Sequence, residues 1–204
     1  MNIAVVDYGL GNIYSVMAAL QEVGLTAEID LDGSTIKKST IALLPGVAAF
    51  GPAMRNLRES GQADALSAHF TSGKKMVGLC LGAQMFLDSS EEAPGVEGFG
   101  FVAGEVVRLD DQLCTVPNQG WLRVADTANS SITPSLGILN DNYFYFSHSF
   151  RMQVGPSATE LGKAISGTEP ILAVYQEGNV LGIQFHPERS GEMGLRFLSS
   201  ALLN

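Results

Sequence analysis

Short apolar runs alternate along the chain with segments in which apolar residues recur every three or four positions. Ile3–Val6 and Ile41–Leu44 are continuous apolar runs that end in glycine-containing turns, a pattern typical of strands buried on both faces of a parallel sheet. Between them, apolar residues recur at helical spacing from Ile13 to Val23, and Gly24 follows as a helix stop. This alternation predicts an α/β fold whose sheet is mostly parallel and flanked by helices.

The remainder of the chain predicts further elements of both kinds. From Gly98 to Val124 the apolar residues stand between glycines, which favours short strands in a small antiparallel sheet. Apolar runs at Ile171–Val174 and Val180–Ile183 flank Glu177-Gly178-Asn179 and predict a hairpin. The other expected elements are a weak strand at 27–29, a helical region at 57–70 broken at 60–61, a loop at 125–140, an aromatic strand at 143–150 and a helix at 191–203. Residues 1–204 are expected to form a single domain.

Composition and charge narrow the class of function. The 204 residues, 46% of them hydrophobic, are enough for one large core. A net charge of −9 and a pI near 4.7 predict that neither nucleic acid nor an anionic membrane is a partner. The sequence shows neither a signal-peptide pattern nor an apolar run near the roughly 20 residues of a membrane helix. Because two cysteines make no disulfide framework, we expect a reducing, cytoplasmic location.

Cys80 lies at the centre of the most informative stretch of the sequence. An apolar run leads into Gly78-Leu79-Cys80-Leu81-Gly82, and a second apolar run follows at helical spacing. The glycines on both sides suit a sharp strand-to-helix turn with the cysteine at its apex. A thiol at the start of a helix is favoured in its thiolate form. Taken alone, the stretch fits a buried structural cysteine equally well.

The segment His186-Pro187-Glu188 offers the groups that could activate Cys80 as a nucleophile. In an extended backbone, side chains two residues apart point the same way, so we expect Glu188 to hold one imidazole nitrogen of His186 while the other faces a thiol. Cysteine, histidine and an orienting carboxylate are the groups needed for thiolate attack on a carbonyl. The three histidines and two cysteines show no metal-ligand spacing, so neither a metal nor another cofactor is expected.

Trp121 is the only tryptophan and lies in a loop-like segment with Asn118, Gln119 and Gly120. An aromatic residue in such a segment is either a core plug or an anchor at an interface, and the sequence leaves both readings open. His69 and His148 are expected to have structural roles. The turn GLGN at 9–12 lacks the third glycine of a dinucleotide fingerprint, and Asn12 is expected to cap the helix that follows.

Two segments together resemble the class I, or triad, glutamine amidotransferases: GLCLGAQ at 78–84 and QFHPERSG at 184–191. Four more are similar to the family of glutaminase subunits of imidazole glycerol phosphate synthase: VVDYGLGN, PGVAAFGPAM, VPNQGWLRV and YFSHSF. The resemblance covers nearly the whole chain. It implies an α/β sheet with a nucleophile elbow, in one type 1 glutamine amidotransferase domain over residues 1–204.

The resemblance also implies residue roles for the hydrolysis of L-glutamine to glutamate and ammonia. Cys80 corresponds to the nucleophile, His186 to the general base and acid, and Glu188 to the group that orients His186. The positions that match substrate-binding residues are Gln84, Ser149 and Phe150, and the positions that match the oxyanion hole are Val47, Ala48 and Leu81.

A partner protein is implied as well. In the family, ammonia passes to a (β/α)8-barrel cyclase subunit in a heterodimer, which makes imidazole glycerol phosphate and the aminoimidazole carboxamide nucleotide of histidine biosynthesis. The loops expected at the carboxyl edge of the sheet would form the docking surface for this subunit, and the interface positions are Asn12, Gln119, Trp121 and Arg189.

Three positions depart from the family's pattern: Ala48 and Leu122 stand where glycine and asparagine are usual, and Phe150 where tyrosine is usual. Such changes also fit a paralogous subunit that supplies ammonia to a sugar-modifying synthetase in surface-polysaccharide biosynthesis. Two more distant alternatives are a cysteine hydrolase or esterase with the same turn, which Gln84 disfavours, and a non-catalytic scaffold, which the complete Cys-His-Glu set disfavours.

Overall fold

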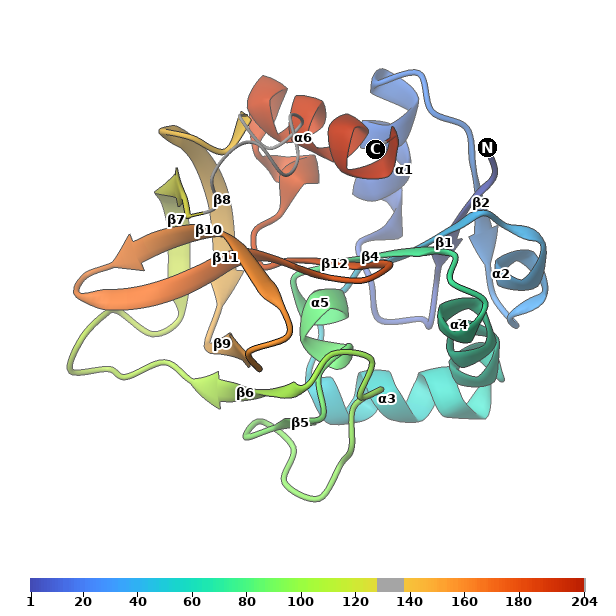
Figure 1. Cartoon of the computed structure of the whole chain (residues 1–204), viewed down its shortest axis with the longest axis horizontal. Helices are drawn as coiled ribbons and strands as arrows, with labels where there is room; N and C mark the ends of the chain where they lie inside the picture. The colour runs from blue at the N-terminus through green and yellow to red at the C-terminus, as the bar shows by residue number, and fades with distance from the viewer. Residues whose placement is uncertain (128–137, 204) are drawn as a thin grey trace.

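The protein, described here from a computed structural model covering residues 1–127 and 138–203, alternates strands and helices before it turns to strands alone (Figure 1). Its elements are β1 (Ile3–Val6), α1 (Ile13–Glu22), β2 (Ala27–Asp30), α2 (Ser34–Lys38), β3 (Ile41–Leu44), α3 (Phe50–Glu59), α4 (Gln62–Thr71), β4 (Lys75–Leu79), α5 (Leu81–Met85), β5 (Ser89–Ser90), β6 (Gly104–Arg108), β7 (Asn118–Asp126), β8 (Asn142–His148), β9 (Phe150–Val154), β10 (Thr159–Ser166), β11 (Glu169–Glu177), β12 (Val180–Ile183), the 3-10 turn η2 (Pro187–Arg189) and α6 (Gly191–Leu203).

One large sheet forms the centre of the molecule, with strand order β2-β1-β3-β4-β12-β11-β10-β7-β8. The strands from β2 to β12 pair in parallel, and the pairs from β12 to β8 are antiparallel. The expected α/β class, with a second, smaller sheet, is confirmed. Parallel pairing is confined to one half of the large sheet, because the strands after β6 follow one another without intervening helices and therefore return as antiparallel neighbours.

The small sheet has the order β5-β6-β9 and packs below the large one. Its β6 and β9 are antiparallel, whereas β5 adds to β6 in parallel through Ser89 and Ser90. Of the region 98–124, which was expected to form this sheet by itself, only β6 belongs to it, because β9 comes from later in the chain and β7 joins the large sheet. The expected hairpin is present as β11 and β12, with β11 extended to Glu169–Glu177. The predicted loop at 125–140 is shortened by β7, which continues to Asp126, and positions 128–137 lie outside the described residues.

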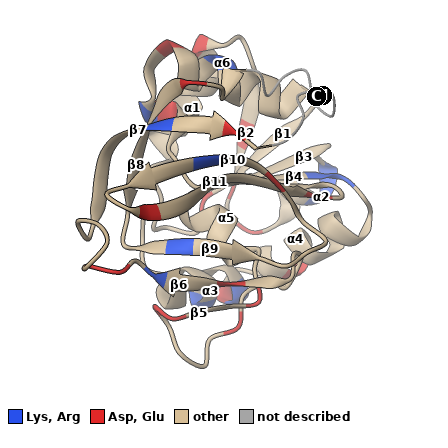
Figure 2. Cartoon of the chain, turned by 60° about the vertical axis from the view of Figure 1, so that its left-hand side comes forward, with Lys and Arg blue, Asp and Glu red and all other residues tan. Residues whose placement is uncertain are grey.

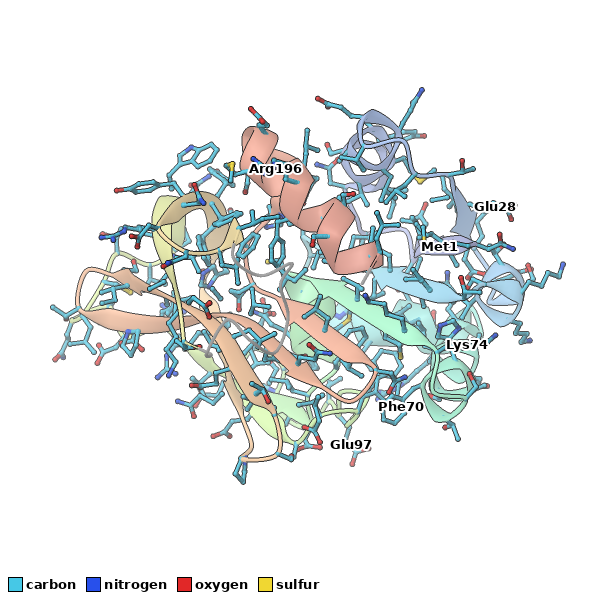
Figure 3. The ribbon with its side chains drawn as sticks, turned by 45° about the horizontal axis from the view of Figure 1, so that its top comes forward. Met1, Glu28, Phe70, Lys74, Glu97 and Arg196 are labelled. Atoms are coloured by element: carbon cyan, nitrogen blue, oxygen red, sulfur yellow. The ribbon has the colours of Figure 1, made fainter. Side chains whose placement is uncertain are left out.

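Helices cover both faces of the parallel half of the sheet (Figure 1). All four residues of β1 and of β3 are buried, as expected of strands in a doubly covered sheet. One apolar cluster joins the sheet to α1 and α6, and a second joins it to α2, α3, α4, α5 and the small sheet. Figure 3 shows α6, which carries Arg196, lying across one face of the sheet. The helical spacing of apolar residues therefore marks the buried faces correctly.

The parallel arrangement gives the sheet two distinct edges. Met1 precedes β1 and Lys74 precedes β4, and both lie on the same side of the molecule in Figure 3, at the amino ends of the strands. The carboxyl ends of β1, β3, β4 and β12 meet at the opposite edge. Ligands of open α/β sheets bind outside the carboxyl ends of the strands, so the segments that follow these four strands define where a site is expected.

Basic residues on three of the antiparallel strands, two in the large sheet and one in the small sheet, are paired with acidic ones. Figure 2 shows basic positions on β7, β9 and β10. Arg123 on β7 pairs with Asp141, and Arg151 on β9 and Lys163 on β10 pair with Glu169 and Glu160, respectively. Pairing neutralises the positive charge that a polyanion would need. None of the helices in the described part of the chain is long and apolar enough to cross a membrane.

Candidate active site

Cys80 lies at the apex of the turn between β4 and α5. Its backbone has φ 50° and ψ −108°, a conformation that residues with a Cβ rarely adopt. The Cys80 N–H donates to Ile183 O at 2.7 Å, which ties the turn to the end of β12. A Cβ on Gly78 would lie 2.5 Å from Ala83 N, and one on Gly82 would overlap Leu44 O. The sharp turn predicted from the two glycines is therefore confirmed, and close backbone contacts are its physical reason.

His186 and Glu188 follow β12 at the same edge. His186 Nδ1 and Glu188 Oε1 are 2.9 Å apart, and the two side chains are only 3% and 2% exposed. The expectation that an extended backbone joins them is wrong: His186 is extended, but Pro187–Arg189 forms the turn η2. The turn brings the carboxylate back onto the ring, and Ser190 Oγ closes it by donating to His186 O at 2.6 Å.

The imidazole lies between a carboxylate and the thiol. It lines the same cavity as Cys80 and interacts electrostatically with the thiol. Burial lowers the pKa of His186, but the Cys80 thiolate and then the Glu188 carboxylate outweigh burial and raise the pKa above its ordinary value. Because Nδ1 donates to Glu188, Nε2 is the nitrogen left to exchange a proton with the sulfur. The arrangement can therefore generate a thiolate and later return a proton.

Cys80 and His186 line a cavity of about 350 Å³ at the carboxyl edge of the sheet, whereas Glu188 contacts His186 but does not line it. The cavity brings together Cys80 and His186 with most of the residues predicted for the site, namely Val47, Ala48, Leu81, Gln84, Ser149, Phe150 and Arg189. Asn12, Gln119 and Trp121 do not line it. No group of three or more His, Cys, Asp or Glu side chains within residues 1–127 and 138–203 is arranged to hold a metal ion.

The loop after β3 borders the nucleophile turn. A Cβ on Gly46 would lie 2.5 Å from Tyr8 Oη and 2.8 Å from Leu81 Cβ, so the loop passes directly against the first residue of α5. Tyr8 Oη donates to Pro45 O at 3.0 Å and holds the loop from below. Ala48 is not among the described non-glycine residues with a positive φ, so its Cβ causes no backbone strain in this conformation.

Hydrogen bonds connect the far wall of the cavity to the thiol. Gln84 Nε2 donates to Phe150 O at 2.9 Å and to Gln184 Oε1 at 3.1 Å, and Gln184 Nε2 donates to Cys80 Sγ at 3.7 Å. His148 Nδ1 lies 2.8 Å from the same Phe150 O. Burial and the positive charge of His186 lower the pKa of His148 to about 4, although the bond to Phe150 O opposes them, so His148 is neutral.

Sequence reasoning did not assign a site role to Gln184, His148 or Glu92. Gln184 lies within the segment QFHPERSG, whose alternation with His186 was a usable signal, because residues two apart on a strand share a face. Glu92 lines the cavity and accepts from Phe50 N at 2.9 Å. Its position in an acidic run gives no local hint of this contact.

Three of the four predicted interface residues gather around Tyr145. Gln119 Nε2 donates to Tyr145 Oη at 3.2 Å, the Arg189 guanidinium lies 4.4 Å from the ring centroid, and Trp121 packs edge-on at 6.1 Å. Trp121 is 53% exposed, so it does not plug the core. We call Gln119, Trp121, Tyr145 and Arg189 the Tyr145 cluster.

Asn12 lies apart from this cluster, in the turn after β1. It occupies the N-cap position of α1 but makes no side-chain cap hydrogen bond, so its expected capping role is wrong. Its backbone, with φ −88° and ψ 61°, differs from the extended conformation of most N-caps. The side chain of Asn12 is therefore not committed to the helix.

The fold and the Cys-His-Glu constellation define a cysteine-dependent amidotransferase, and sequence comparison agrees. The family model for class-I glutamine amidotransferases matches residues 4–203, and the chain belongs to this family. Among curated relatives, the imidazole glycerol phosphate synthase subunit HisH of Sulfurimonas denitrificans is 36% identical over 97% of the chain and 96% of its own length. The HisH subunit of Caldanaerobacter subterraneus is 39% identical over the same shares. Within the family, the chain is therefore a member of the HisH group.

Solved structures agree on the fold. A crystal structure titled glutamine amidotransferase superposes with a TM-score of 0.77 over 98% of this chain and 99% of its own, at 18% identity. A structure of PurLQS from Thermotoga maritima gives a TM-score of 0.73 over 98% and 97%, at 21% identity.

Proposed function

We propose that this chain is the glutaminase subunit of an imidazole glycerol phosphate synthase, a single type 1 amidotransferase domain over residues 1–204 that works in the cytoplasm. It hydrolyses L-glutamine to glutamate and ammonia. The observation that carries the proposal is the buried 2.9 Å contact between His186 and Glu188, with Cys80 and His186 lining the same cavity. A free structural cysteine would need neither a charged partner nor an orienting carboxylate.

Each triad residue has one role in the reaction. The Cys80 thiolate attacks the carboxamide carbon of glutamine, and His186 gives its proton to the nitrogen that leaves as ammonia. His186 then takes a proton from water, which attacks the glutamyl thioester and releases glutamate and the thiolate. Glu188 stays ionised and holds the imidazole in the tautomer that both steps require.

Backbone amides next to the nucleophile stabilise the oxyanion. Leu81 follows Cys80 at the start of α5, and the loop at Val47 and Ala48 lies against Leu81 across Gly46. Two donors at the developing oxyanion are together worth several kcal/mol, since one such donor contributes about 3 kcal/mol. The N–H of Leu81 and an amide of the Val47–Ala48 segment are the proposed donors.

The walls of the cavity select glutamine. Both N–H groups of Gln84 are used by protein acceptors, which leaves Gln84 Oε1 to accept from the substrate. Ser149 and Phe150 border the cavity from the junction of β8 and β9, and the Glu92 carboxylate provides negative charge suited to the α-ammonium group. These groups would bind the two ends of an amino acid that carries a side-chain amide.

The ammonia acceptor is a cyclase subunit of (β/α)8-barrel fold, joined to this chain in a heterodimer. Released ammonia would enter its barrel and serve the formation of imidazole glycerol phosphate and the aminoimidazole carboxamide nucleotide. Gln119, Trp121 and Arg189 of the Tyr145 cluster, together with Asn12, would contact the barrel. Arg189 links the two regions because it lines the cavity and stacks on Tyr145. The names of the relatives favour histidine biosynthesis over the surface-polysaccharide alternative.

Replacing the nucleophile tests the proposal. In the complex with the cyclase subunit, Cys80→Ala should abolish synthesis from glutamine and leave synthesis from added ammonium salt intact. Cys114→Ala is the matched control, because Cys114 is also a buried free cysteine but its thiol contacts Asp110 O outside the cavity. Turnover of esters but not of glutamine would favour the hydrolase alternative, and glutamine-driven synthesis that survives Cys80→Ala would refute the proposal.

A further inference from the structure

Two buried carboxamides lie directly behind the nucleophile. Gln84 is 4% exposed and Gln184 is fully buried, although they are 100 residues apart in the chain. Gln184 follows β12, and its backbone N–H donates to Ala173 O at 2.8 Å. That bond ties the Gln184 backbone to β11, and the Gln184 side chain reaches Cys80 Sγ at 3.7 Å. A fully buried amide remains stable only if its polar atoms have partners, so the identity of these partners carries information.

The neighbouring groups determine which end of Gln184 faces the sulfur. Phe150 O can only accept, so the Gln84 amide must present its nitrogen there. The second hydrogen on this nitrogen points at Gln184, which therefore presents its oxygen to Gln84. The remaining end of Gln184, its NH₂ group, lies 3.7 Å from Cys80 Sγ. A donor, and not an acceptor, thus faces the nucleophile.

A second chain of hydrogen bonds ends on the same Phe150 carbonyl. Ser166 Oγ donates to Asn118 Oδ1 at 3.0 Å, so the Asn118 amide turns its nitrogen toward His148 Nε2, 2.9 Å away. His148 then carries its proton on Nδ1 and donates to Phe150 O at 2.8 Å. The Phe150 carbonyl is therefore held in place by two donors. Fully satisfied buried networks of this kind rigidify the structure around them.

We infer that Gln184 is a catalytic hydrogen-bond donor that stabilises the Cys80 thiolate, and that Gln84 is the positioning residue that holds it in this orientation. The inference deepens the proposed glutaminase function and rests on it for the role of the thiolate. An N–H aimed at an anionic sulfur favours the anion, as donors do at other buried anions. Gln84 also lines the substrate cavity. A substrate that contacts Gln84 would therefore affect the Gln184 amide through the hydrogen bond between the two glutamines.

Other titratable groups act on the same sulfur and must be kept constant in a test. His186 lies on one side of Cys80, and Tyr8 approaches from the loop after β1. Glu188 and the neutral His148 act on Cys80 through His186. Substitutions at Gln184 leave all four in place. Any change in the thiolate population can then be assigned to the amide.

The test is the pH profile of Cys80 alkylation by iodoacetamide, followed by mass spectrometry of the Cys80 peptide in the full chain. Gln184→Met removes the donor at similar volume, and Gln184→Glu keeps the shape but places a carboxylate oxygen at the sulfur. Loss of a hydrogen bond to a charged group should move the midpoint up by about one pH unit in Gln184→Met, a roughly tenfold loss of thiolate below the midpoint. Gln184→Glu should shift it further.

Gln176→Met, half-buried on β11, is the matched control and should retain the wild-type midpoint. Midpoints that stay at the wild-type value in both Gln184 variants would overturn the inference. So would a rate that falls equally at every pH, because such a fall indicates only a structural role. If Gln184→Met does not unfold cooperatively, it is not properly folded, and the alkylation midpoint of the isosteric Gln184→Glu variant alone decides the test. A shifted midpoint in a chain that never turns over glutamine with its cyclase partner would uphold the inference and refute the proposed function.

Discussion

Acidification is expected to destabilise this protein through His148. The imidazole is 7% exposed, its Nε2 accepts from Asn118, and its Nδ1 donates to Phe150 O. Protonation would place a hydrogen on Nε2 facing the NH₂ of Asn118, beside the positive charge of His186. Burial first, and then His186, lower the pKa of His148 from 6.5 to about 4.

The sign of the effect follows from proton binding. Between pH 6.5 and 4 the unfolded chain binds a proton at this histidine and the folded chain does not, so the free energy of unfolding falls as the pH falls. With these two pKa values the loss is about 2 kcal/mol at pH 5 and about 3 kcal/mol at pH 4. The pKa of His186 is raised instead, to about 10. Its contribution to the free energy of unfolding is therefore fully present below pH 6.5 and is lost progressively as the pH rises toward 10.

Urea denaturation at pH 7, 6 and 5 measures the effect, with His148→Gln as the reference protein. Glutamine is neutral and offers both a donor and an acceptor, so this variant lacks the titration but keeps the polarity of the site. Subtracting its free energy of unfolding from that of the wild type cancels the carboxylates and His69, which are common to both. The difference should shrink by about 2 kcal/mol between pH 7 and pH 5. A difference that stays constant within about 0.5 kcal/mol would refute the reasoning.

Three further changes probe the site and its surroundings. Glu188→Gln removes the buried carboxylate from His186 and should lower glutamine turnover ~10- to 150-fold. This range corresponds to the loss of a hydrogen bond to a charged group, about 1.5–3 kcal/mol. Ammonia-driven synthesis by the complex is the control and should be unchanged. Gly78→Ala should lower the free energy of unfolding by about 1–3 kcal/mol and remove most glutaminase activity, because the added Cβ would lie 2.5 Å from Ala83 N. In the control Gly51→Ala, the atom nearest to the added Cβ would be 3.3 Å away. An equal loss in both variants would contradict the prediction. Trp121→Ala should leave thermal stability nearly unchanged but weaken binding to the cyclase subunit ~30-fold, or about 2 kcal/mol, as measured by titration calorimetry. The control Ile29→Ala, at the opposite edge of the sheet, should bind like the wild type.

Local sequence patterns predicted much of the fold because the forces behind them are local. Helical spacing of apolar residues identified α1 and α6, and continuous apolar runs identified β1 and β3. Apart from the hairpin of β11 and β12, the sequence did not distinguish the parallel from the antiparallel half of the large sheet. Strand pairing depends on which distant segment lies alongside, and β7, for example, pairs with β10 and β8.

In the candidate site, too, the sequence predicted the features that depend on neighbouring residues. The glycines around Cys80 and the short spacing from His186 to Glu188 are features of neighbouring residues, and both the turn and the buried pair are present. The link between His186 and Glu188 was misjudged, because a 3-10 turn and an extended strand can bring the same two side chains together.

The sequence by itself therefore determined the strand-to-helix turn at Cys80, the His186–Glu188 pair and the family to which the chain belongs. Only the tertiary structure decided that Gln184 faces the sulfur, that Phe150 O is held by both Gln84 and His148, and that the Tyr145 cluster forms beside the cavity. The physical reason is separation along the chain. Gln184 and Cys80 are 104 residues apart, and their contact depends on the order in which β4 and β12 enter the sheet, which no local periodicity encodes.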